Sequence, residues 1–200
     1  MRFLQEIFRM TAPHFRMQDT SLSGCIIIES IVAEDERGCF GRTYSAAEFA
    51  AIGLDVTFIE SSVSKNPRAG TLRGLHFQAA PYEEIKLVSC SRGRIFDVAV
   101  DLRAESETFG RWTAVELSAD RLQSLYIPKG MAHGFMTLEA NTDVRYEMSV
   151  SYRPDAARGV RWDDAEIGIA WPDVGELTMS HRDRNLPTLA DLDATLSPRG

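Results

Sequence analysis

Two histidines stand in stretches whose residue types and spacing could carry chemistry. The first, His76, lies in the run Gly70-Thr-Leu-Arg-Gly-Leu-His-Phe-Gln78. Alternate side chains of a strand point to one face, so His76 and Gln78 would share the face opposite to Leu75 and Phe77. A histidine on such a face can take up or release a proton near neutral pH. Taken alone, the run fits a buried structural histidine, hydrogen-bonded to a backbone carbonyl, better than a catalytic one.

The second histidine, His133, ends the run Tyr126-Ile-Pro-Lys-Gly-Met-Ala-His. Its Pro-x-Gly-x-x-His spacing resembles the second motif of the cupins, and Gly74 to Gln78 stands where the first cupin motif would lie. A metal-binding cupin gathers several nitrogen and oxygen ligands at one point, usually with His-x-His in its first motif. Gln78 replaces the second of those histidines and is a poor ligand. We therefore expect no metal, with a metal held by His76 and His133 as the alternative.

The elements that must position these residues are short strands. Strand patterns cover residues 26–32, 56–62, 72–78, 85–91, 94–102, 113–117, 124–127, 134–138 and 144–150. Many short strands separated by turn signals predict a mainly β protein, a cupin-type antiparallel β-barrel or jelly roll with a few short helices. One helix is predicted over 46–52, from a capping box at Ser45 and Glu48 to a stop at Gly53. A second helical pattern, at 189–196, belongs to a tail expected to pack on the barrel.

One predicted strand carries charge on a single face. In Ile95–Leu102 the even-numbered positions are apolar, while Asp97 and Asp101 lie on the other face. Asp97 is therefore predicted either to line the lumen of the barrel or to face solvent.

Composition limits the class of protein. The chain has 200 residues, 44% of them hydrophobic, which is enough for one domain with a sizeable core. Its net charge of −7 disfavours nucleic-acid binding as the main function. We expect residues 1–22 to be a poorly ordered N-terminal extension and residues 23–200 to be a single domain.

The cysteines and the hydrophobic runs bear on location. Cys25, Cys39 and Cys90 are odd in number and have no Cys-x-x-Cys spacing, which fits a reducing compartment better than a disulfide scaffold. No run has the length of a membrane span or the apolar core of a signal peptide. We therefore expect a cytoplasmic protein without a membrane partner.

A set of motifs in one order resembles the dTDP-4-dehydrorhamnose 3,5-epimerase family. The resemblance runs from about residue 26 to residue 189 and rests on Leu72-Arg-Gly-Leu-His-Phe-Gln78, Lys86-Leu-Val, Phe96-Asp-Val-Ala-Val-Asp-Leu-Arg103, Thr108-Phe-Gly-Arg-Trp112, Ile127-Pro-Lys-Gly-Met-Ala-His-Gly-Phe135, Tyr146, Arg161-Trp-Asp-Asp164 and Trp171-Pro172. So many motifs are highly specific for the family and much less so for the sugar.

The resemblance implies epimerisation without a cofactor. A proton leaves a carbon beside the 4-keto group of a nucleotide-linked 6-deoxyhexose, and a proton returns to the opposite face. Within the family pattern, His76 matches the base and Asp183 the carboxylate that orients it. Lys86 matches the ammonium near the keto oxygen, and Tyr146 matches the acid on the other side. Tyr146 shares a predicted strand face with Val144 and Met148, which favours a pocket position.

Matched binding positions are kept only in part. Arg37, Arg73 and Arg182 match basic positions around the diphosphate and sugar, Tyr152 matches the ring that stacks on thymine, and His133 matches a pocket histidine. The other predicted substrate contacts are Phe40, Arg42, Glu60, Ser62 and Gln78. Read alone, each would more often be a solvated or packing residue.

Several positions depart from the family pattern. Arg42 stands where the family usually has glutamate, Glu60 and Ser62 alter a Gln-x-Asn-x-Ser run, and Ala157 replaces a glutamate. Arg42 and Glu60 could form a reciprocal charge swap. The proton chemistry is thus predicted to be intact, and the nucleotide and sugar contacts rewritten.

The family resemblance leaves three activities to compare. The first is inversion of C3, C5 or both in a dTDP-4-keto-6-deoxyhexose, in deoxysugar biosynthesis. The second is inversion of only one of these carbons, on an unusual nucleotide-linked 4-keto sugar. The third, from another class, is a non-catalytic sugar-binding or metal-binding cupin. The resemblance also implies a homodimer, through pairing at sheet edges.

Overall fold

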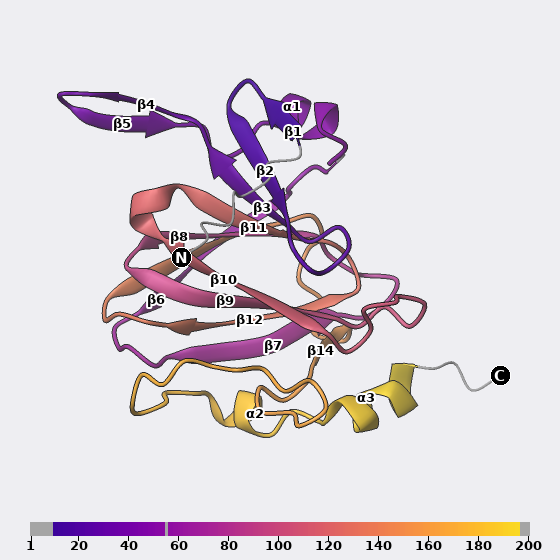
Figure 1. The fold of residues 1–200 in the computed structure, drawn as a ribbon. Helices are drawn as coiled ribbons and strands as arrows, with labels where there is room; N and C mark the ends of the chain where they lie inside the picture. Colours follow the sequence, from indigo (N-terminus) through magenta and orange to yellow (C-terminus); the bar gives the residue numbers. More distant parts are fainter. Residues whose placement is uncertain (1–9, 55, 197–200) are drawn as a thin grey trace, which may run out of the picture.

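The computed structural model describes residues 10–54 and 56–196. Within them, the strands form two antiparallel sheets that face each other, and a separate hairpin (Figure 1). In the larger sheet the strand order is β1 (Met10–Ala12), β2 (Phe15–Asp19), β3 (Ile26–Ser30), β11 (Gln123–Ile127), β8 (Lys86–Arg92), β13 (Thr142–Met148) and β6 (Glu60–Asn66). In the smaller sheet it is β10 (Trp112–Ser118), β9 (Arg94–Asp101), β12 (Met131–Thr137), β7 (Leu72–Gln78) and β14 (Ala157–Gly159). The prediction of a mainly β jelly roll of cupin type is confirmed.

The remaining elements are short. The hairpin pairs β4 (Val32–Asp35) with β5 (Gly38–Gly41) and projects away from both sheets (Figure 1). The helices are α1 (Ala46–Ala51), the 3-10 turn η1 (Ala119–Arg121), α2 (His181–Arg184) and α3 (Leu189–Leu196). Among the described residues, no helix has the length and apolar composition needed to cross a bilayer.

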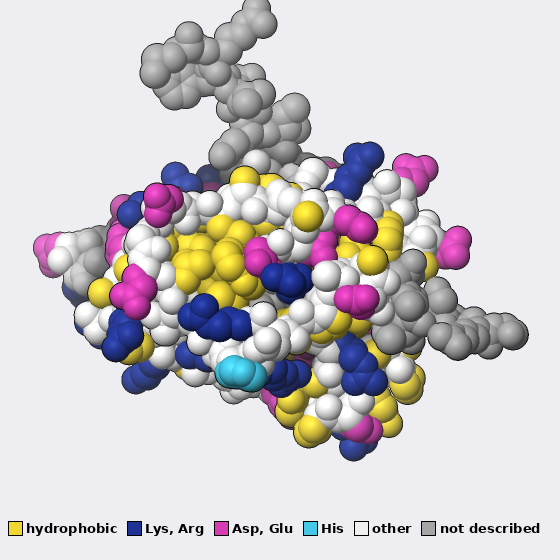
Figure 2. All heavy atoms as spheres, turned by 90° about the horizontal axis from the view of Figure 1, so that it is seen from below, with side chains coloured by type: hydrophobic (Ala, Val, Ile, Leu, Met, Phe, Trp, Pro, Cys, Tyr) yellow, Lys and Arg dark blue, Asp and Glu magenta, His cyan; other side chains and the backbone are white. Residues whose placement is uncertain are grey.

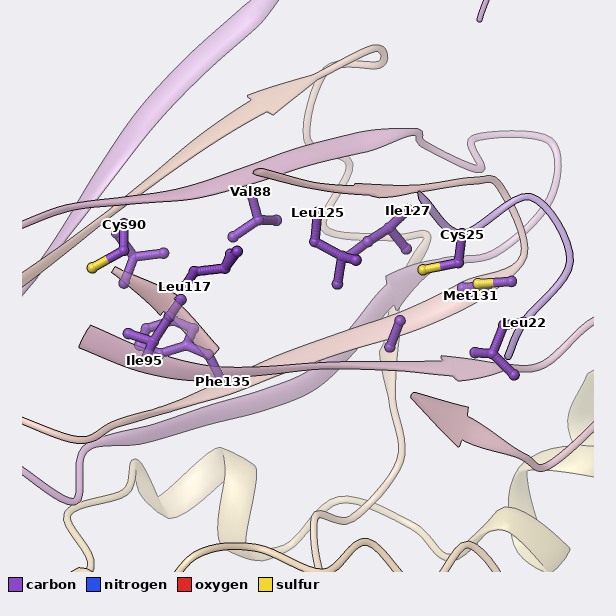
Figure 3. Packing of buried hydrophobic residues seen from close by; sticks show 12 residues of the cluster. Leu22, Cys25, Val88, Cys90, Ile95, Leu117, Leu125, Ile127, Met131 and Phe135 are labelled. Carbon is purple, nitrogen blue, oxygen red and sulfur yellow. The ribbon is translucent and has the colours of Figure 1, made fainter. Parts of the chain in front are cut away.

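The main hydrophobic core lies between the two sheets. Val88, Leu125 and Ile127 reach it from the larger sheet and meet Ile95 and Phe135 from the smaller one (Figure 3). Each of these side chains is at most 1% exposed, and such burial is the dominant stabilising term in folding.

Two cysteines belong to this core as unpaired thiols. Burial raises the pKa of Cys25 to about 12 and that of Cys90 to about 11. Neither thiol is therefore a ready nucleophile, because the thiolate is the reactive form. The cytoplasmic location expected from the cysteines stays a prediction.

Apolar segments also cover the outer faces of both sheets. Phe49 of α1 packs against Phe15 and Ile28 on the larger sheet. On the smaller sheet, Leu189 and Leu192 of α3 join a cluster with Val98, Val100 and Leu102 of β9 and the residue after it. The tail therefore packs on the barrel, as the sequence predicted.

The predicted boundary at residue 22 is wrong for the part of the extension that the structure describes. Residues 10–19 form β1 and β2, and β2 pairs along its length with β3. Phe15 is fully buried and Met17 is 4% exposed. The alternation of these two apolar residues with Arg16 and Gln18 is a strand signal that places the segment in the sheet. Residues 1–9 lie outside the described part of the chain.

The strand predicted over 56–62 begins four residues later, as β6. Val56 and Phe58 pack with α1 instead of pairing in the sheet, and Tyr44 donates a hydrogen bond to the carbonyl of Val56. The predicted cap of α1 is confirmed in one half, since Ser45 Oγ accepts from Glu48 N. The Glu48 carboxylate does not close the box but accepts from His14 N.

The close approach of β7 and β12 sets the position of both histidines. A Cβ added to Gly74, whose φ is +129°, would lie 2.5 Å from the Cα of Gly134. Only glycines allow the two backbones this distance. The pairing shifts register between His133 and Phe135, and His133 lies directly opposite His76.

Replacing Phe15 with Ala tests whether β2 belongs to the folded domain. The ring is fully buried and lies edge-on to Phe49 at 5.1 Å between centroids. We expect the free energy of unfolding to fall by about 3 to 5 kcal/mol in chemical denaturation. Ile59→Ala, at a side chain that is 60% exposed, should cost much less. Equally small losses in both variants would mean that residues 10–19 do not belong to the domain.

Candidate active site

A cavity of about 650 Å³ lies between the sheets, where β6 at the edge of the larger sheet faces β7 and β14 of the smaller one. Its lining residues are Ser62, Val63, Ser64, Lys65, Arg73, His76, Phe77, Gln78, Glu84, Lys86, His133, Phe135, Tyr146, Met148, Tyr152, Ala157, Arg158, Ser180, Arg182 and Asp183. A hollow of similar size at residues 19–24 and 103–108 carries no histidine, lysine or tyrosine. The chemistry predicted from the sequence therefore belongs to the first cavity.

His76 and Asp183 form a hydrogen-bonded pair in this cavity. His76 Nε2 lies 2.8 Å from Asp183 Oδ1, and the backbone N–H of Gly74 donates to Asp183 Oδ2 over 3.4 Å. Ser180 caps α2 by accepting from Asp183 N, which fixes the start of the helix. Burial alone would raise the pKa of Asp183, but the bonds from His76, Gly74 and Ser180 hold it below its usual range.

Lys86 sits in a network of polar groups at one side of the cavity. Its Nζ lies 3.0 Å from Glu84 Oε1 and donates to the carbonyl of His76 over 3.3 Å. The amide of Gln78 donates to Glu84 Oε2 over 3.1 Å and accepts from Arg153 N over 2.6 Å. Lys86 is thus held next to the backbone of His76, and the amide of Gln78 is committed to protein partners.

Tyr146 enters the cavity from the opposite sheet. It lies on β13, whereas His76 lies on β7. Its ring contacts His133 and Phe135 at centroid distances of 5.9 and 6.4 Å. Burial and the negative charge of Asp97 raise the pKa of the Tyr146 phenol above its ordinary value. The phenol is therefore protonated at neutral pH and can act as an acid.

Most predicted substrate contacts lie in this cavity. Lining it are Ser62, Arg73, Gln78, His133, Tyr152 and Arg182, together with all four predicted catalytic residues. Tyr152 is 57% exposed, so its ring is open to a partner. On the molecular face nearest α2 and α3, Lys and Arg side chains lie beside exposed hydrophobic ones (Figure 2).

Four predicted contacts lie elsewhere in the chain. Arg37 and Phe40 are on the projecting hairpin, where Arg37 pairs with Asp35 and Phe40 is 77% exposed. Arg42 and Glu60 also lie outside the lining of the cavity. Within the chain, Arg42 Nη1 donates to Glu48 Oε1 over 3.0 Å, and the charge swap suggested for Arg42 and Glu60 stays a prediction.

Sequence reasoning missed several residues of this cavity. Lys65 and Arg158 add positive charge to its wall, and Glu84 holds Lys86. Asp97 is fully buried and hydrogen-bonded to His133. Of the two positions predicted for its side chain, the structure therefore has the one inside the barrel. The alternation of β9 had singled out Asp97, but its partner lies 36 residues away and leaves no local signal.

No three His, Cys, Asp or Glu side chains come together as metal ligands within the described residues. Instead His76 and His133 each direct Nε2 at an aspartate oxygen 2.8 Å away. In both histidines, Nε2 is therefore already engaged by an aspartate of the protein.

Comparison with known proteins gives one consistent family. The family model described as dTDP-4-dehydrorhamnose 3,5-epimerase matches residues 19–191. The enzyme of that name from Methanothermobacter thermautotrophicus is 46% identical over 179 residues, covering 88% of this chain and 96% of the relative.

Solved structures agree with this assignment. The dTDP-6-deoxy-D-glucose-3,5-epimerase of Legionella pneumophila, in complex with dTDP-4-keto-L-rhamnose, superposes with a TM-score of 0.87 at 36% identity, covering 94% of this chain and 99% of that one. A 3'-monoepimerase of Streptomyces bikiniensis, in complex with dTDP-quinovose, gives a TM-score of 0.83 at 34% identity, covering 90% and 91%. With a family model that spans most of its length and relatives of this similarity, the chain belongs to the dTDP-4-dehydrorhamnose 3,5-epimerase family.

Proposed function

We propose that this chain inverts C3 and C5 of a dTDP-4-keto-6-deoxyhexose in deoxysugar biosynthesis, by removing and returning protons without a cofactor. The observation that carries the proposal is the placement of His76 and Tyr146 on opposing sheets around one cavity. Inversion at a carbon needs a base on one face of the sugar and an acid on the other. The 4-keto group makes the neighbouring C–H bonds acidic enough for such a base.

His76 is the proposed base. With Nε2 held by Asp183, the other ring nitrogen takes the proton from the carbon, and the electron pair of the C–H bond moves to the keto oxygen as an enolate. The Asp183 carboxylate stabilises the imidazolium that forms. The Lys86 ammonium, kept beside the His76 carbonyl, offsets the enolate charge.

Tyr146 is the proposed acid. Its raised pKa keeps the hydroxyl protonated until a carbanion-like centre accepts the proton on the face away from His76. The carbon–hydrogen bond forms as the keto group is restored, and the phenolate regains a proton from solvent. The same pair of groups serves either carbon when the sugar turns within the cavity.

Basic side chains along the wall are the proposed contacts of the diphosphate. Arg73 and Arg182 were predicted in this role, and Lys65 and Arg158 share the wall with them. Guanidinium groups suit phosphate oxygens because they donate two parallel hydrogen bonds. The exposed ring of Tyr152 is the proposed stacking surface for the base.

A single inversion is the second candidate. The Streptomyces bikiniensis relative is named a 3'-monoepimerase and is 34% identical to this chain, close to the identity of the Legionella 3,5-epimerase. A non-catalytic sugar-binding or metal-binding cupin would have no need of a base and an acid on opposite walls.

The chain is also proposed to form a homodimer. Phe40 and Arg37 on the hairpin are exposed and lie outside the cavity of their own chain. If these residues contact substrate, the cavity must be that of a second copy, and β6 offers it an open sheet edge with Val63 54% exposed. In the same arrangement, Arg42 and Glu60 also remain proposed contacts of the substrate.

The first prediction from this proposal separates the base from the acid. In deuterated water with dTDP-4-keto-6-deoxyglucose, His76→Asn should abolish deuterium exchange at C3 and C5, because it removes the group proposed to take the first proton. Tyr146→Phe should still exchange deuterium while inversion fails or slows much more. Nuclear magnetic resonance follows exchange at both carbons in one mixture.

The two variants can contradict the assignment independently. Near-normal exchange in His76→Asn would remove His76 as the base. Equal losses of exchange and inversion in Tyr146→Phe would mean that Tyr146 positions the sugar without supplying a proton. Exchange at one carbon only, in the wild type, would favour the monoepimerase.

The second prediction concerns Asp183→Asn. Losing the charge that steadies the imidazolium should slow exchange by about 10²-fold or more. The pKa of Asp183 is lower in the folded protein than its ordinary 3.8, so its carboxylate stabilises the fold above that pH and loses this effect as the pH falls below it. Denaturation should therefore show a destabilised variant at neutral pH and a smaller difference below pH 3.8.

Asp163→Asn is the matched control for this variant. Asp163 also has a lowered pKa, through its hydrogen bond from Arg161, and lies outside the lining of the cavity. Exchange should stay at the wild-type rate in this control. Wild-type exchange in Asp183→Asn would show that His76 needs no carboxylate partner.

The third prediction is the oligomeric state. Light scattering at micromolar concentration should give twice the mass of the chain, and Phe40→Ser should weaken both association and substrate affinity. A stable monomer with full activity would refute the shared cavity.

A further inference from the structure

A second histidine and aspartate pair lies next to the first. His133 Nε2 is 2.8 Å from Asp97 Oδ1, and His133 lies directly opposite His76 on the neighbouring strand. His133 is 4% exposed and Asp97 is fully buried. The proposed proton transfers by His76 and Tyr146 do not involve this pair directly. Its place beside the cavity therefore calls for another explanation.

Asp97 is energetically unfavourable at its position. Its Oδ2 is buried and has no hydrogen-bond partner among the described residues. Its neighbours on the same face of β9 are Ile95 and Ala99, which belong to the hydrophobic core. Ile95 can be seen within that core in Figure 3. A buried carboxylate oxygen without a partner costs free energy that an apolar side chain would avoid. Asp101, farther along the same face, is by contrast saturated, with bonds from Arg103, Ser106 and Thr108.

The pair acts on the ring of Tyr146. His133 meets that ring edge-on, with an angle of 78° between the planes, and Phe135 contacts it as well. Through space, the Asp97 charge raises the pKa of the phenol.

Other groups around the phenol lower its pKa or share the cavity with it. Arg73 on β7 and a hydrogen bond with Ser64 on β6 lower its pKa, without overcoming burial and Asp97. Lys86 on β8, His76 on β7 and Glu84 share the cavity with the ring. Asp97 is thus the acidic group whose charge favours the protonated phenol.

We propose that His133 and Asp97 are positioning residues for Tyr146, His133 fixing the direction of the ring and Asp97 favouring the hydroxyl over the phenolate. The proposal rests on the proposed function of Tyr146 as proton donor. A phenol that has given its proton to carbon must regain one before the next inversion, and a nearby negative charge makes the phenolate unfavourable. Burial raises the pKa of the Asp97 carboxyl itself, and the hydrogen bond and charge of His133, together with the charge of Lys86, act against that rise.

The effect of the Asp97 charge on Tyr146 is tested without substrate. The ionisation of tyrosine is followed by ultraviolet absorbance in an alkaline titration of the wild type and of Asp97→Asn. The same titration of each protein with Tyr146→Phe added is then subtracted, which leaves the signal of Tyr146 alone. Asparagine keeps an acceptor for His133 and removes the charge, so the Tyr146 ionisation should move to lower pH by about one unit or more. Asp101→Asn, the control at an equally buried aspartate on the same strand, should leave that ionisation unchanged. An ionisation that stays in place in Asp97→Asn overturns the proposal.

The role of His133 in positioning the Tyr146 ring is tested with His133→Gln. Glutamine can still donate to Asp97 but offers no ring edge to Tyr146. The ratio of inversion to deuterium exchange, measured in one mixture and hence independent of substrate affinity, should fall about tenfold or more while exchange by His76 continues. A wild-type ratio overturns the positioning role.

Failure of the proposed function would look different. If the wild-type protein neither exchanges nor inverts a dTDP-4-keto sugar, the epimerase assignment fails. The titration shift of Tyr146 in Asp97→Asn would still support the contact between the pair and the phenol, and an unchanged titration would still overturn it.

Discussion

The hydrogen bond between His76 and Asp183 is the contact on which the candidate site depends. It joins a strand of the smaller sheet to a helix 107 residues later in the chain. The helix can reach this place only because the tail folds across the smaller sheet. Leu189 and Leu192 bury themselves there, and Asp164 accepts a hydrogen bond from Leu189 N over 2.8 Å. Hydrophobic burial of the tail thus fixes the carboxylate beside the imidazole.

The two-sheet architecture adds the second requirement, which is a difference between the walls of the cavity. His76 and Asp183 stand on the side of the smaller sheet, where the carboxylate is hydrogen-bonded and has a lowered pKa. Tyr146 stands on the larger sheet, and its burial, together with the charge of Asp97 on β9 of the smaller sheet, raises the pKa of its phenol. Environments that push the pKa values of neighbouring groups apart separate a base from an acid. Packing of two sheets around one hollow therefore supplies both the distance and the chemical contrast.

Local patterns predicted much of this arrangement. The run 72–78 is a strand with the predicted bounds, because its apolar residues are flanked by turn signals at Gly70 and Pro81. The family motifs placed His76, Lys86, Tyr146 and Asp183 in one site, and all four line the same cavity. The strand at Phe15 and Met17 was missed although its alternation is visible, since polar residues around it suggested an extension.

Contacts that depend on tertiary packing could not be predicted in the same way. Arg42 pairs with Glu48 because α1 turns that carboxylate back toward the sheet, and nothing in the sequence ranks it above Glu60. Lys86 and Gln78 share Glu84, which lies in the connection between β7 and β8, because that connection folds its carboxylate within reach of both side chains. The pairing of Asp97 with His133 depends on the register of β9 against β12. Such choices are made by tertiary packing, which local propensity does not contain.

The central claim is that the base and the acid face opposite sides of one bound sugar. A crystal structure with a dTDP-hexose that lacks the 4-keto group, and therefore cannot react, tests it most directly. The account predicts the pyranose ring between His76 and Tyr146, with one side chain on each face and the Lys86 ammonium near the oxygen on C4. A ring with both side chains on the same face, or a sugar bound outside this cavity, would contradict it.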